Sequence, residues 1–510
     1  MLFNSYEFIF AFFPAVFAGF YLIGARSPTA AARFLGLMSL LFYGWWSLQA
    51  LPLLIGSIIF NYWWGGQLAA ESASSNRRSW KLWFAVGANL GMLGVFKYAD
   101  FFIASVNGGL IAGGVQPLRA LHLVLPIGIS FYTFTQIAFL VDCWRGLVRE
   151  RSFSHYLLFV TYFPHLIAGP VLHHAQMMPQ FAHAQTYRPS AAKLCLGLAT
   201  FTLGLTKKLV FADPLGQYAD LVFDAVKTGL EPSFLTAWLG VMAYALQIYF
   251  DFSGYSDMAI GIALCLGVQL PINFLSPYKA TSIIDFWRRW HVSLSTFLRD
   301  YLYIPLGGGR KGTVRRYINL AVTMILGGLW HGASWTFVLW GTLHGLFLIV
   351  NHLWRAVSGP IIPQRVSPLI CPLVCPLVCP LIRPFIASFA WLLTFGCVCV
   401  AWVLFRSDSL PTAIAFYRGM FGLNGFPPSP FGGMSVPFQQ SEFYQLILVG
   451  LVWCVALPSS NRLREWLPNP VRWTRRAGLA AFGTALIAGL MFGYCVSRLG
   501  QHSPFLYFQF

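Results

Sequence analysis

The sequence predicts an all-α polytopic membrane protein, and its composition carries most of that prediction. Hydrophobic residues make up 57% of the 510 residues, aromatic residues 17% and charged residues only 10%. A soluble protein carries about 25% charged residues, so no soluble class fits this chain. Apolar runs close to the length of about 20 residues that a spanning helix needs recur from one end of the chain to the other.

The apolar runs predict roughly ten to twelve transmembrane helices, together with re-entrant and interfacial helices. Two runs, 121–142 and 162–172, contain both proline and glycine, so they are expected to be broken helices. Broken backbone is tolerated in a membrane only where protein or a water-filled cavity surrounds it. The runs lie around 6–24, 34–48, 50–66, 82–97, 121–142, 154–172, 194–212, 234–250, 255–272, 317–329, 332–353, 387–405, 443–459 and 477–497.

The net charge of +18 does not indicate a nucleic-acid-binding protein. The basic residues lie mostly in short loops between apolar runs, which is the pattern that the positive-inside rule produces. Loops 25–33, 71–81 and 143–153 are therefore placed in the cytoplasm, and both termini are expected outside it. The first apolar run is expected to be a retained span, because no basic segment precedes it and no cleavage site follows.

The ten cysteines predict neither a disulfide framework nor a metal site. Most of them lie inside apolar runs, where cysteine behaves as a small hydrophobic residue, and no CxxC pair occurs. Residues 367–386 repeat a four-residue unit with one proline in each, which predicts an extended loop and not a regular helix. Metal binding by Cys371, Cys375 and Cys379 is the alternative reading of that repeat.

A first histidine, His291, lies in the segment 281–301. If that segment is one helix, His291 shares an apolar stripe with Trp287 and Leu294, while the charged residues lie off the stripe. The segment is then an amphipathic helix at the membrane surface or below a cytoplasmic cavity. A histidine on this face has two possible roles, as part of a reactive site or as a core residue bonded to a backbone carbonyl.

A second histidine, His331, lies at a glycine-rich break between two apolar runs, in GGLWHGASW (327–335). A histidine with a pKa near neutral can act as a general base. A purely structural role is equally compatible with the local sequence. His344 follows 13 residues later, about 220° around a continuous helix, so it is excluded from the same site and expected to be structural.

Polar residues also occur in IYFDFSGYSDMAIG (248–261), which contains Asp251, Ser253, Tyr255 and Asp257. Two carboxylates inside an apolar segment need partners, and these are expected among Lys279, Arg288 and Arg289. They could mark the wall of a reaction cavity, or a helix break satisfied by its own side chains. The turn LGGGRKG (306–312) resembles a phosphate-binding loop but lacks the P-loop spacing, so a cytoplasmic turn is the simpler interpretation.

These segments resemble the membrane-bound O-acyltransferase (MBOAT) family, and within it the bacterial alginate O-acetyltransferase branch. The resemblance is carried by WRRWHVSLSTFLRDYLYIPLGGGRKG (287–312) and GGLWHGASWTFVLWGTLHG (327–345). It extends over nearly the whole chain through MLFNSYEFIFAFFP at the start, LPIGISFYTFTQIAFLVDCWRG (125–146), YFPHLIAGPV (162–171), DFSGYSDMAIG (251–261), WVLFRSDSL (402–410) and SPFLYFQF at the end. The tetrapeptide repeat departs from the family pattern.

The resemblance implies a ring of helices around a central tunnel that opens to the cytoplasm. His331 matches the histidine regarded as catalytic in the family, and His291 matches a second motif position. The donor would be cytoplasmic acetyl-CoA, with no bound cofactor. The acetyl group would reach an exopolysaccharide outside the bacterial inner membrane, of the alginate or cellulose type, through a periplasmic or membrane-anchored partner acetyltransferase.

Further residues receive roles in this interpretation. Trp287, Trp330 and Trp335 are expected to wall the tunnel, and Asp251, Ser253 and Tyr255 to line the cavity. The cations that could contact the phosphates of the donor are Arg288, Arg289, Arg310 and Lys311. The chain is expected to form one membrane domain over 1–510, with N-terminal helices (1–115), a catalytic core (116–355), the repeat loop (356–386) and C-terminal helices (387–510).

Three other functions remain open from the sequence. Broken helices are also found in transporters and flippases, although no internal repeat relates two halves of this chain. A non-catalytic scaffold of a polysaccharide secretion complex is a second possibility. The third is transfer of D-alanine from a carrier protein to teichoic acid by a sister branch of the same family.

Overall fold

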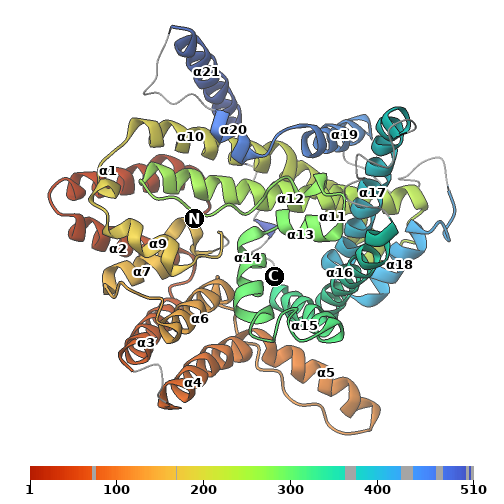
Figure 1. Cartoon of the computed structure of the whole chain (residues 1–510), viewed down its shortest axis with the longest axis horizontal. Coiled ribbons are helices and arrows are strands. Elements are labelled where there is room, and N and C mark those ends of the chain that lie inside the picture. Colours follow the sequence, from red (N-terminus) through yellow and green to blue (C-terminus); the bar gives the residue numbers. More distant parts are fainter. Residues whose placement is uncertain are drawn as a thin grey trace. The chain divides into compact units, whose positions relative to one another are not determined.

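The computed structural model describes residues 1–71, 76–167, 169–361, 375–426, 440–466, 475–500 and 505–506. These residues form helices joined by turns and extended linkers, and the described part of the chain contains no β-strand (Figure 1). The prediction of an all-α polytopic protein is therefore confirmed.

The chain divides into two compact units. Unit 1 comprises residues 1–210, 251–272 and 460–510, and unit 2 comprises residues 211–250 and 273–459. Helix α12 (Phe234–Cys265) and the π-helical turn η4 (Lys207–Ala212) each contribute residues to both units. The expected division of one membrane domain into the segments 1–115, 116–355, 356–386 and 387–510 stays a prediction.

Unit 1 contains the N-terminal helices, the second part of α12 and the last two helices. Its other elements are η1 (Phe8–Phe12), α1 (Phe13–Gly24), α2 (Pro28–Trp46), α3 (Leu51–Ala70), α4 (Asn76–Leu93), η2 (Gly94–Tyr98), α5 (Ala99–Ala112), α6 (Ile129–Arg145), α7 (Phe153–Thr161), α8 (Phe163–Leu166), α9 (His174–Ala182), η3 (Ala184–Tyr187), α10 (Ala191–Thr206), α20 (Ser460–Trp466) and α21 (Arg475–Arg498).

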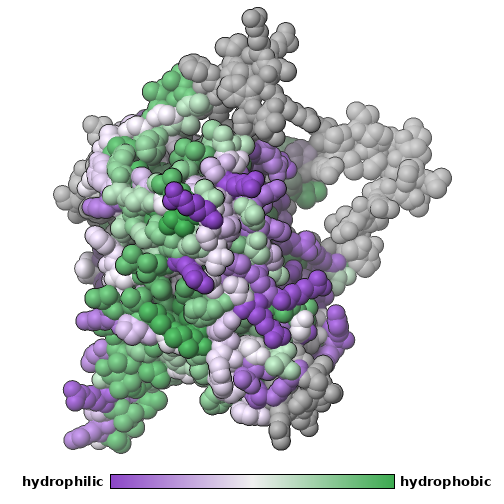
Figure 2. Space-filling view, turned by 90° about the vertical axis from the view of Figure 1, so that its left-hand side faces the viewer, coloured by the Kyte–Doolittle hydropathy of each residue, from purple (hydrophilic) through white to green (hydrophobic). Residues whose placement is uncertain are grey.

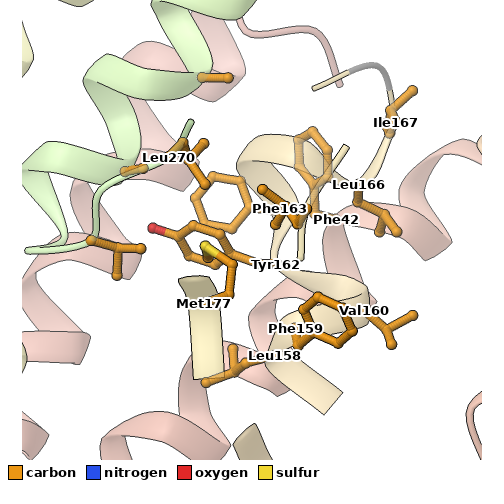
Figure 3. Close-up of a cluster of buried hydrophobic side chains, with 14 of the residues drawn as sticks. Phe42, Leu158, Phe159, Val160, Tyr162, Phe163, Leu166, Ile167, Met177 and Leu270 are labelled. Atoms are coloured by element: carbon orange, nitrogen blue, oxygen red, sulfur yellow. The ribbon is translucent and has the colours of Figure 1, made fainter. Parts of the chain in front are cut away.

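The core of unit 1 is built largely from aromatic side chains. Figure 3 shows Phe42 of α2, Phe159 of α7, Phe163 of α8 and Met177 of α9 gathered with Leu270, which follows α12. The rings of Phe42 and Phe163 lie 5.5 Å apart. Rings at such separations gain packing energy beyond the area that they bury, so short helices from distant parts of the sequence are held in one cluster.

Unit 2 contains the first part of α12 and both motif histidines. Its other elements are α11 (Asp213–Lys227), η5 (Pro277–Lys279), α13 (Ile283–Arg289), α14 (Val292–Leu298), η6 (Arg299–Tyr303), α15 (Thr313–His331), α16 (Trp335–Ile361), α17 (Cys375–Arg406), α18 (Leu410–Met420) and α19 (Gln440–Ala456).

Four helical segments among the described residues are long and apolar enough to cross a membrane: Ser79–Ala112, Ala191–Lys227, Trp335–Val357 and Pro384–Arg406. Three shorter apolar helices lie at Phe8–Gly24, Ser441–Ala456 and Ala485–Arg498. Large hydrophobic side chains such as Leu22 and Trp45 are exposed, and Figure 2 shows hydrophobic residues over much of one face. The chain is a multi-pass membrane protein. The expected ten to twelve spans exceed the four found by length and composition.

Both runs expected to be broken contain a break. Helix α6 starts at Ile129, after Gly128, whose φ of 71° lies in the left-handed region. A Cβ at Gly128 would approach the carbonyl oxygen of Leu166 to 2.9 Å, so only glycine fits there without a shift. Helix α7 ends at Thr161 and the four-residue α8 follows.

The prediction of a loop over 356–386 is wrong at both ends of that range. Helix α16 continues to Ile361, and α17 begins at Cys375, while residues 362–374 lie outside the described residues. Pro376 occupies the first turn of α17, where a missing N–H costs no intrahelical hydrogen bond. Pro380 and Pro384 lie further inside the helix. Membrane helices tolerate internal prolines because neighbouring groups form hydrogen bonds with the carbonyls that proline leaves unpaired.

Candidate active site

The site is built on the antiparallel hairpin of α15 and α16 in unit 2. Glycines let the two helices approach closely: a Cβ at Gly328 would lie 2.3 Å from the carbonyl oxygen of Phe337. A Cβ at Gly341 would lie 2.3 Å from the carbonyl oxygen of Met324. Neither position can hold a larger residue without moving backbone, so small residues set the spacing of this helix pair.

His331 is the last residue of α15. The helix ends because Gly332 is extended, with φ −161° and ψ 150°, and α16 starts only at Trp335. The hydroxyl of Ser334 accepts a hydrogen bond from the N–H of Thr336 at 3.3 Å. A Cβ at Gly332 would lie 2.1 Å from the ring of Phe337, so the break needs glycine. The backbone thus reverses immediately after the histidine.

The imidazole of His331 lies among aromatic rings and is 6% exposed. Its ring centroid is 4.8 Å from that of Trp330, 5.1 Å from that of Trp340 and 5.1 Å from that of Phe405. These rings come from α15, α16 and α17. They shield the imidazole from bulk water while leaving it at a helix end.

His291 lies between two short helices. The single helix expected over 281–301 is wrong, since α13 ends at Arg289 and α14 starts at Val292. His291 itself has φ 42° and ψ 56°, in the left-handed region that a residue with a Cβ seldom adopts. A stripe of apolar residues does not reveal such a break, because apolar positions three and four residues apart fit two short helices as well as one.

Neighbouring backbone holds His291 in this conformation. The N–H of Val292 donates to the carbonyl of Asn273 at 2.9 Å, and the hydroxyl of Ser293 donates to the side-chain oxygen of Asn273 at 2.6 Å. On the other side, the N–H of Leu275 donates to the carbonyl of Arg289 at 3.0 Å. The segment before α13 therefore fixes the backbone on both sides of the histidine.

The structure brings the two motif histidines to one indole. The ring of His291 lies 6.3 Å from Trp330, and the ring of His331 lies 4.8 Å from the same side chain. His291 is fully buried, and this burial lowers its pKa to about 3. Its imidazole is therefore neutral at physiological pH, and a neutral imidazole can donate one hydrogen bond and accept another.

His344 belongs to the same surroundings, contrary to the sequence argument. That argument assumed a continuous helix, and the helix ends at His331. The ring of His344 lies 4.8 Å from Trp340, and its Nδ1 accepts a hydrogen bond from Nε1 of Trp287 at 3.3 Å. His344 is fully buried and stacks on Phe286.

We call the rings around the three histidines the aromatic cluster. Sequence reasoning identified only Trp287 and Trp330 among its members. The segment WVLFRSDSL (402–410) was a signal for two of the others, since it contributes Trp402 and Phe405. The cluster consists of Phe286, Trp287, Trp290, Trp330, Trp340, Trp402 and Phe405.

Among the expected tunnel residues, Trp330 is buried, Trp287 is half-buried and Trp335 is 55% exposed at the start of α16. The expected wall role of Trp335 stays a prediction.

Asp251, Ser253 and Tyr255 are buried in unit 1, whereas both motif histidines lie in unit 2. Their expected place in the reaction cavity also stays a prediction. Helix α12 runs through this segment without the break that the sequence suggested.

The two carboxylates of α12 find partners that the sequence analysis missed. Asp251 pairs with Lys208 at 2.6 Å, and Asp257 pairs with Lys207 at 2.7 Å, all four being buried. The expected partners Lys279, Arg288 and Arg289 are therefore wrong. Further donors complete both pairs: the N–H of Leu506 donates to Asp251 at 2.9 Å, and the hydroxyl of Ser460 donates to Asp257 at 2.7 Å.

The candidate donor-binding cations all lie in unit 2. Arg288, Arg310 and Lys311 are exposed, while Arg289 is held by Asp285 at 2.9 Å. The turn 306–312 needs its glycines, because Gly307, Gly308 and Gly312 have positive φ. Its backbone is fixed by Asn319, which donates to the carbonyl of Gly308 at 2.9 Å.

Comparison with known proteins gives consistent results. The model of a family described as MBOAT, membrane-bound O-acyltransferase family, matches residues 144–374, which include both motif histidines. The peptidoglycan O-acetyltransferase of Helicobacter pylori is 38% identical over 100% of this chain and 98% of its own length. The probable alginate O-acetylase AlgI of Pseudomonas putida is 38% identical, and that of Azotobacter vinelandii 37%, each over 100% of both chains.

Proposed function

Because this chain belongs to the membrane-bound O-acyltransferase family, we propose that it moves an acetyl group from cytoplasmic acetyl-CoA to a hydroxyl group, for O-acetylation of a polysaccharide outside the membrane. The observation that carries the proposal is the position of His331, at the end of α15 between Trp330 and Trp340, with His291 on the same indole of Trp330. Two imidazoles in a shielded aromatic site suit acyl transfer, which needs a base and a donor to the oxyanion.

His331 is the general base in this mechanism. The acceptor oxygen attacks the thioester carbonyl carbon while its proton passes to Nε2 of His331. The tetrahedral intermediate then collapses, the carbon–sulfur bond breaks, and the departing thiolate takes the proton back from the imidazolium. The carboxyl end of a helix carries partial negative charge, so the end of α15 stabilises the imidazolium that forms between these two steps.

His291 has a different role, because burial keeps its imidazole neutral. A neutral imidazole donates a hydrogen bond to the oxyanion of the tetrahedral intermediate or orients His331. Its backbone is fixed on both sides by the hydrogen bonds of Asn273 and Leu275, so the ring is positioned before the substrate binds. Preorganised donors of this kind are effective because they need no reorganisation during the reaction.

The aromatic cluster protects the thioester. Water in the site would compete with the acceptor hydroxyl and hydrolyse the donor. Trp340 and Phe405 cover two sides of the imidazole of His331, and Trp330 covers a third. A hydroxyl that enters through the cluster meets the base in an environment with little bulk water.

The acceptor is proposed from the names of the relatives. One full-length relative is a peptidoglycan O-acetyltransferase and two are probable alginate O-acetylases. Both named substrates are polysaccharides of the cell envelope or its exterior, and cellulose shares the same hydroxyl chemistry. We place the chain in the bacterial inner membrane with both termini in the periplasm. A periplasmic or membrane-anchored acetyltransferase would receive the acetyl group and deliver it to the polymer.

The test is acetyl release from labelled acetyl-CoA by the purified protein in detergent, with and without a hydroxyl acceptor. Wild type should consume the donor, and His331→Ala should lose that activity while remaining monodisperse. His344→Gln is the matched control, since it alters a buried imidazole of the same cluster that the mechanism does not use. Equal consumption of acetyl-CoA by wild type and His331→Ala would show that His331 is not the general base. Turnover of a D-alanyl carrier protein, with none of acetyl-CoA, would show that acetyl-CoA is not the acyl donor.

A further inference from the structure

A cluster of cations lies at the end of the α15–α16 hairpin away from His331. One guanidinium nitrogen of Arg316 lies 2.6 Å from Nδ1 and 3.2 Å from Nε2 of His352. Arg288, Arg316 and Arg355 all act electrostatically on His352. Three helices, α13, α15 and α16, thus bring three arginines around one imidazole.

The arrangement of these arginines is fixed by neighbouring groups. Arg355 donates to the hydroxyl of Ser282, the N-cap of α13, at 3.3 Å. A Cβ at Gly309 would lie 3.6 Å from Cδ of Arg316, so the stem of this arginine packs beside the glycine turn. The turn itself is held through the carbonyl of Gly308 by Asn319.

Among the residues that the structure describes, no carboxylate pairs with these three arginines, Arg288, Arg316 and Arg355. The nearby Asp285 is bound to Arg289. The first turn of α15 contains no acidic residue, although a helix N-terminus carries about half a unit of positive charge. The N-terminus of α15 and the guanidinium groups of the three arginines therefore repel one another unless an anion lies between them.

We propose that Arg288, Arg316 and Arg355 bind a phosphate ester beside the glycine turn at the N-terminal end of α15. Guanidinium groups suit this ligand because their fork of donors matches the phosphate oxygens. Arg288 is also one of the cations expected to contact the phosphates of the acyl donor, so a soluble ligand at this site rests on the proposed function. The binding itself does not require that His331 react. His352 lies eight residues after His344 on α16, so the site is about 12 Å along that helix from the aromatic cluster.

The phosphate ester has two chemical sources. One is a soluble molecule, for which the exposed Arg288 and the glycine turn are accessible. The other is the headgroup of an anionic lipid. Trp354 is 65% exposed beside Arg355, and a tryptophan next to an arginine at a helix end is typical of the membrane interface.

The experiment uses the full-length protein in detergent and two probes. Adenosine 3′,5′-bisphosphate is titrated by calorimetry to represent the soluble source. Phosphatidylglycerol is added in a thermal-shift assay, with phosphatidylcholine as the neutral lipid. The variants are the double variant Arg316→Gln/Arg355→Gln and the single variant Arg288→Gln. The side chain of Arg288 is exposed, so the fold is expected to tolerate its loss. Arg418→Gln on α18 is the matched control, an exposed arginine of unit 2 paired with Glu231 at 3.7 Å.

The double variant should bind at least one probe about a hundredfold more weakly than wild type or worse, because it removes two donors of charge-assisted hydrogen bonds. Arg288→Gln should weaken the same probe, and Arg418→Gln should not. Loss confined to the nucleotide identifies a soluble ligand, and loss confined to phosphatidylglycerol identifies a lipid. Equal binding of both probes by wild type and both site variants overturns the proposal, as does no binding by wild type. His331→Ala should bind like wild type, which separates this result from the fate of the proposed activity.

Discussion

The imidazole of His331 lies edge-on against the indole of Trp340, with ring centroids 5.1 Å apart and planes at 84°. His344 contacts the same indole at 4.8 Å. One tryptophan thus contacts both the expected base and a second buried imidazole. A change at this position therefore tests whether the aromatic cluster positions the base or merely fills space.

We expect Trp340→Ala to lower acetyl transfer more than Trp340→Phe, and to raise hydrolysis of the donor relative to transfer, because water enters the space left by the ring. Removing a buried aromatic side chain also costs about 3–5 kcal/mol of stability. The measurement is the ratio of acetylated acceptor to free acetate from labelled acetyl-CoA. Leu346→Ala, at an exposed position on the same helix, is the control. An unchanged ratio in Trp340→Ala would remove the water-excluding role.

A second prediction concerns the backbone of His291. Asparagine adopts the left-handed region more readily than other residues with a Cβ and retains an N–H donor. His291→Asn should therefore fold and keep part of the activity. His291→Ala should lose about 10²–10³ in kcat, the typical effect of removing an oxyanion donor. Equal kcat values for the two variants would show that hydrogen-bond donation by residue 291 does not contribute.

A third prediction follows from the pKa of His291, which burial lowers to about 3. In the unfolded chain this imidazole titrates near 6.5, so between these values the unfolded state binds one more proton than the folded state. Stability therefore falls as pH falls below about 6.5, by roughly 2 kcal/mol at pH 5 from this group alone. Thermal unfolding in detergent at pH 5, 6 and 7 measures it. His291→Asn should show a shallower decline; an identical decline would mean that other groups cause it.

The sequence predicted the fold class and both motif histidines, and His291 and His331 indeed lie on one indole. What it missed at His291 was the backbone. Apolar positions three and four residues apart fit one helix and fit two short helices equally well. The left-handed conformation depends on Asn273 and Leu275, whose hydrogen bonds come from a segment outside any helix.

The partners of the α12 carboxylates could not be predicted from the sequence for a similar reason. Lys207 and Lys208 lie inside the apolar run 194–212, and they are 50 and 43 residues from Asp257 and Asp251. No local spacing connects them. The sequence analysis therefore expected the partners among Lys279, Arg288 and Arg289, of which Arg289 is instead paired with Asp285. His344 was misplaced because Gly332 reverses the chain, which a constant angle per residue cannot show.

A fourth prediction tests the packing of the hairpin that carries His331. Gly341→Ala should disturb α15, because the new Cβ would lie 2.3 Å from the carbonyl oxygen of Met324. Overpacking of this kind costs about 1–3 kcal/mol, and the shift reaches the base at the end of the same helix. Gly345→Ala is the matched control one turn away, where the nearest atom, of Ala321, is 3.3 Å distant. Melting temperature and acetyl transfer should both fall further in Gly341→Ala; equal effects would show that the hairpin adjusts.

The last prediction concerns the buried ion pair of Lys208 and Asp251. Both side chains are almost inaccessible, so removing one partner leaves a buried charge, at a cost of about 3–5 kcal/mol. Asp251→Leu and Lys208→Met should each destabilise the protein strongly, and the double variant should recover most of the loss. The exposed pair of Lys227 and Asp408, also 2.6 Å apart, is the control and should give a coupling energy below about 1 kcal/mol. The double-mutant cycle is measured by thermal unfolding in detergent. Additive losses at Lys208 and Asp251 would mean that the carboxylate is stabilised chiefly by the N–H of Leu506, at 2.9 Å, and not by the lysine.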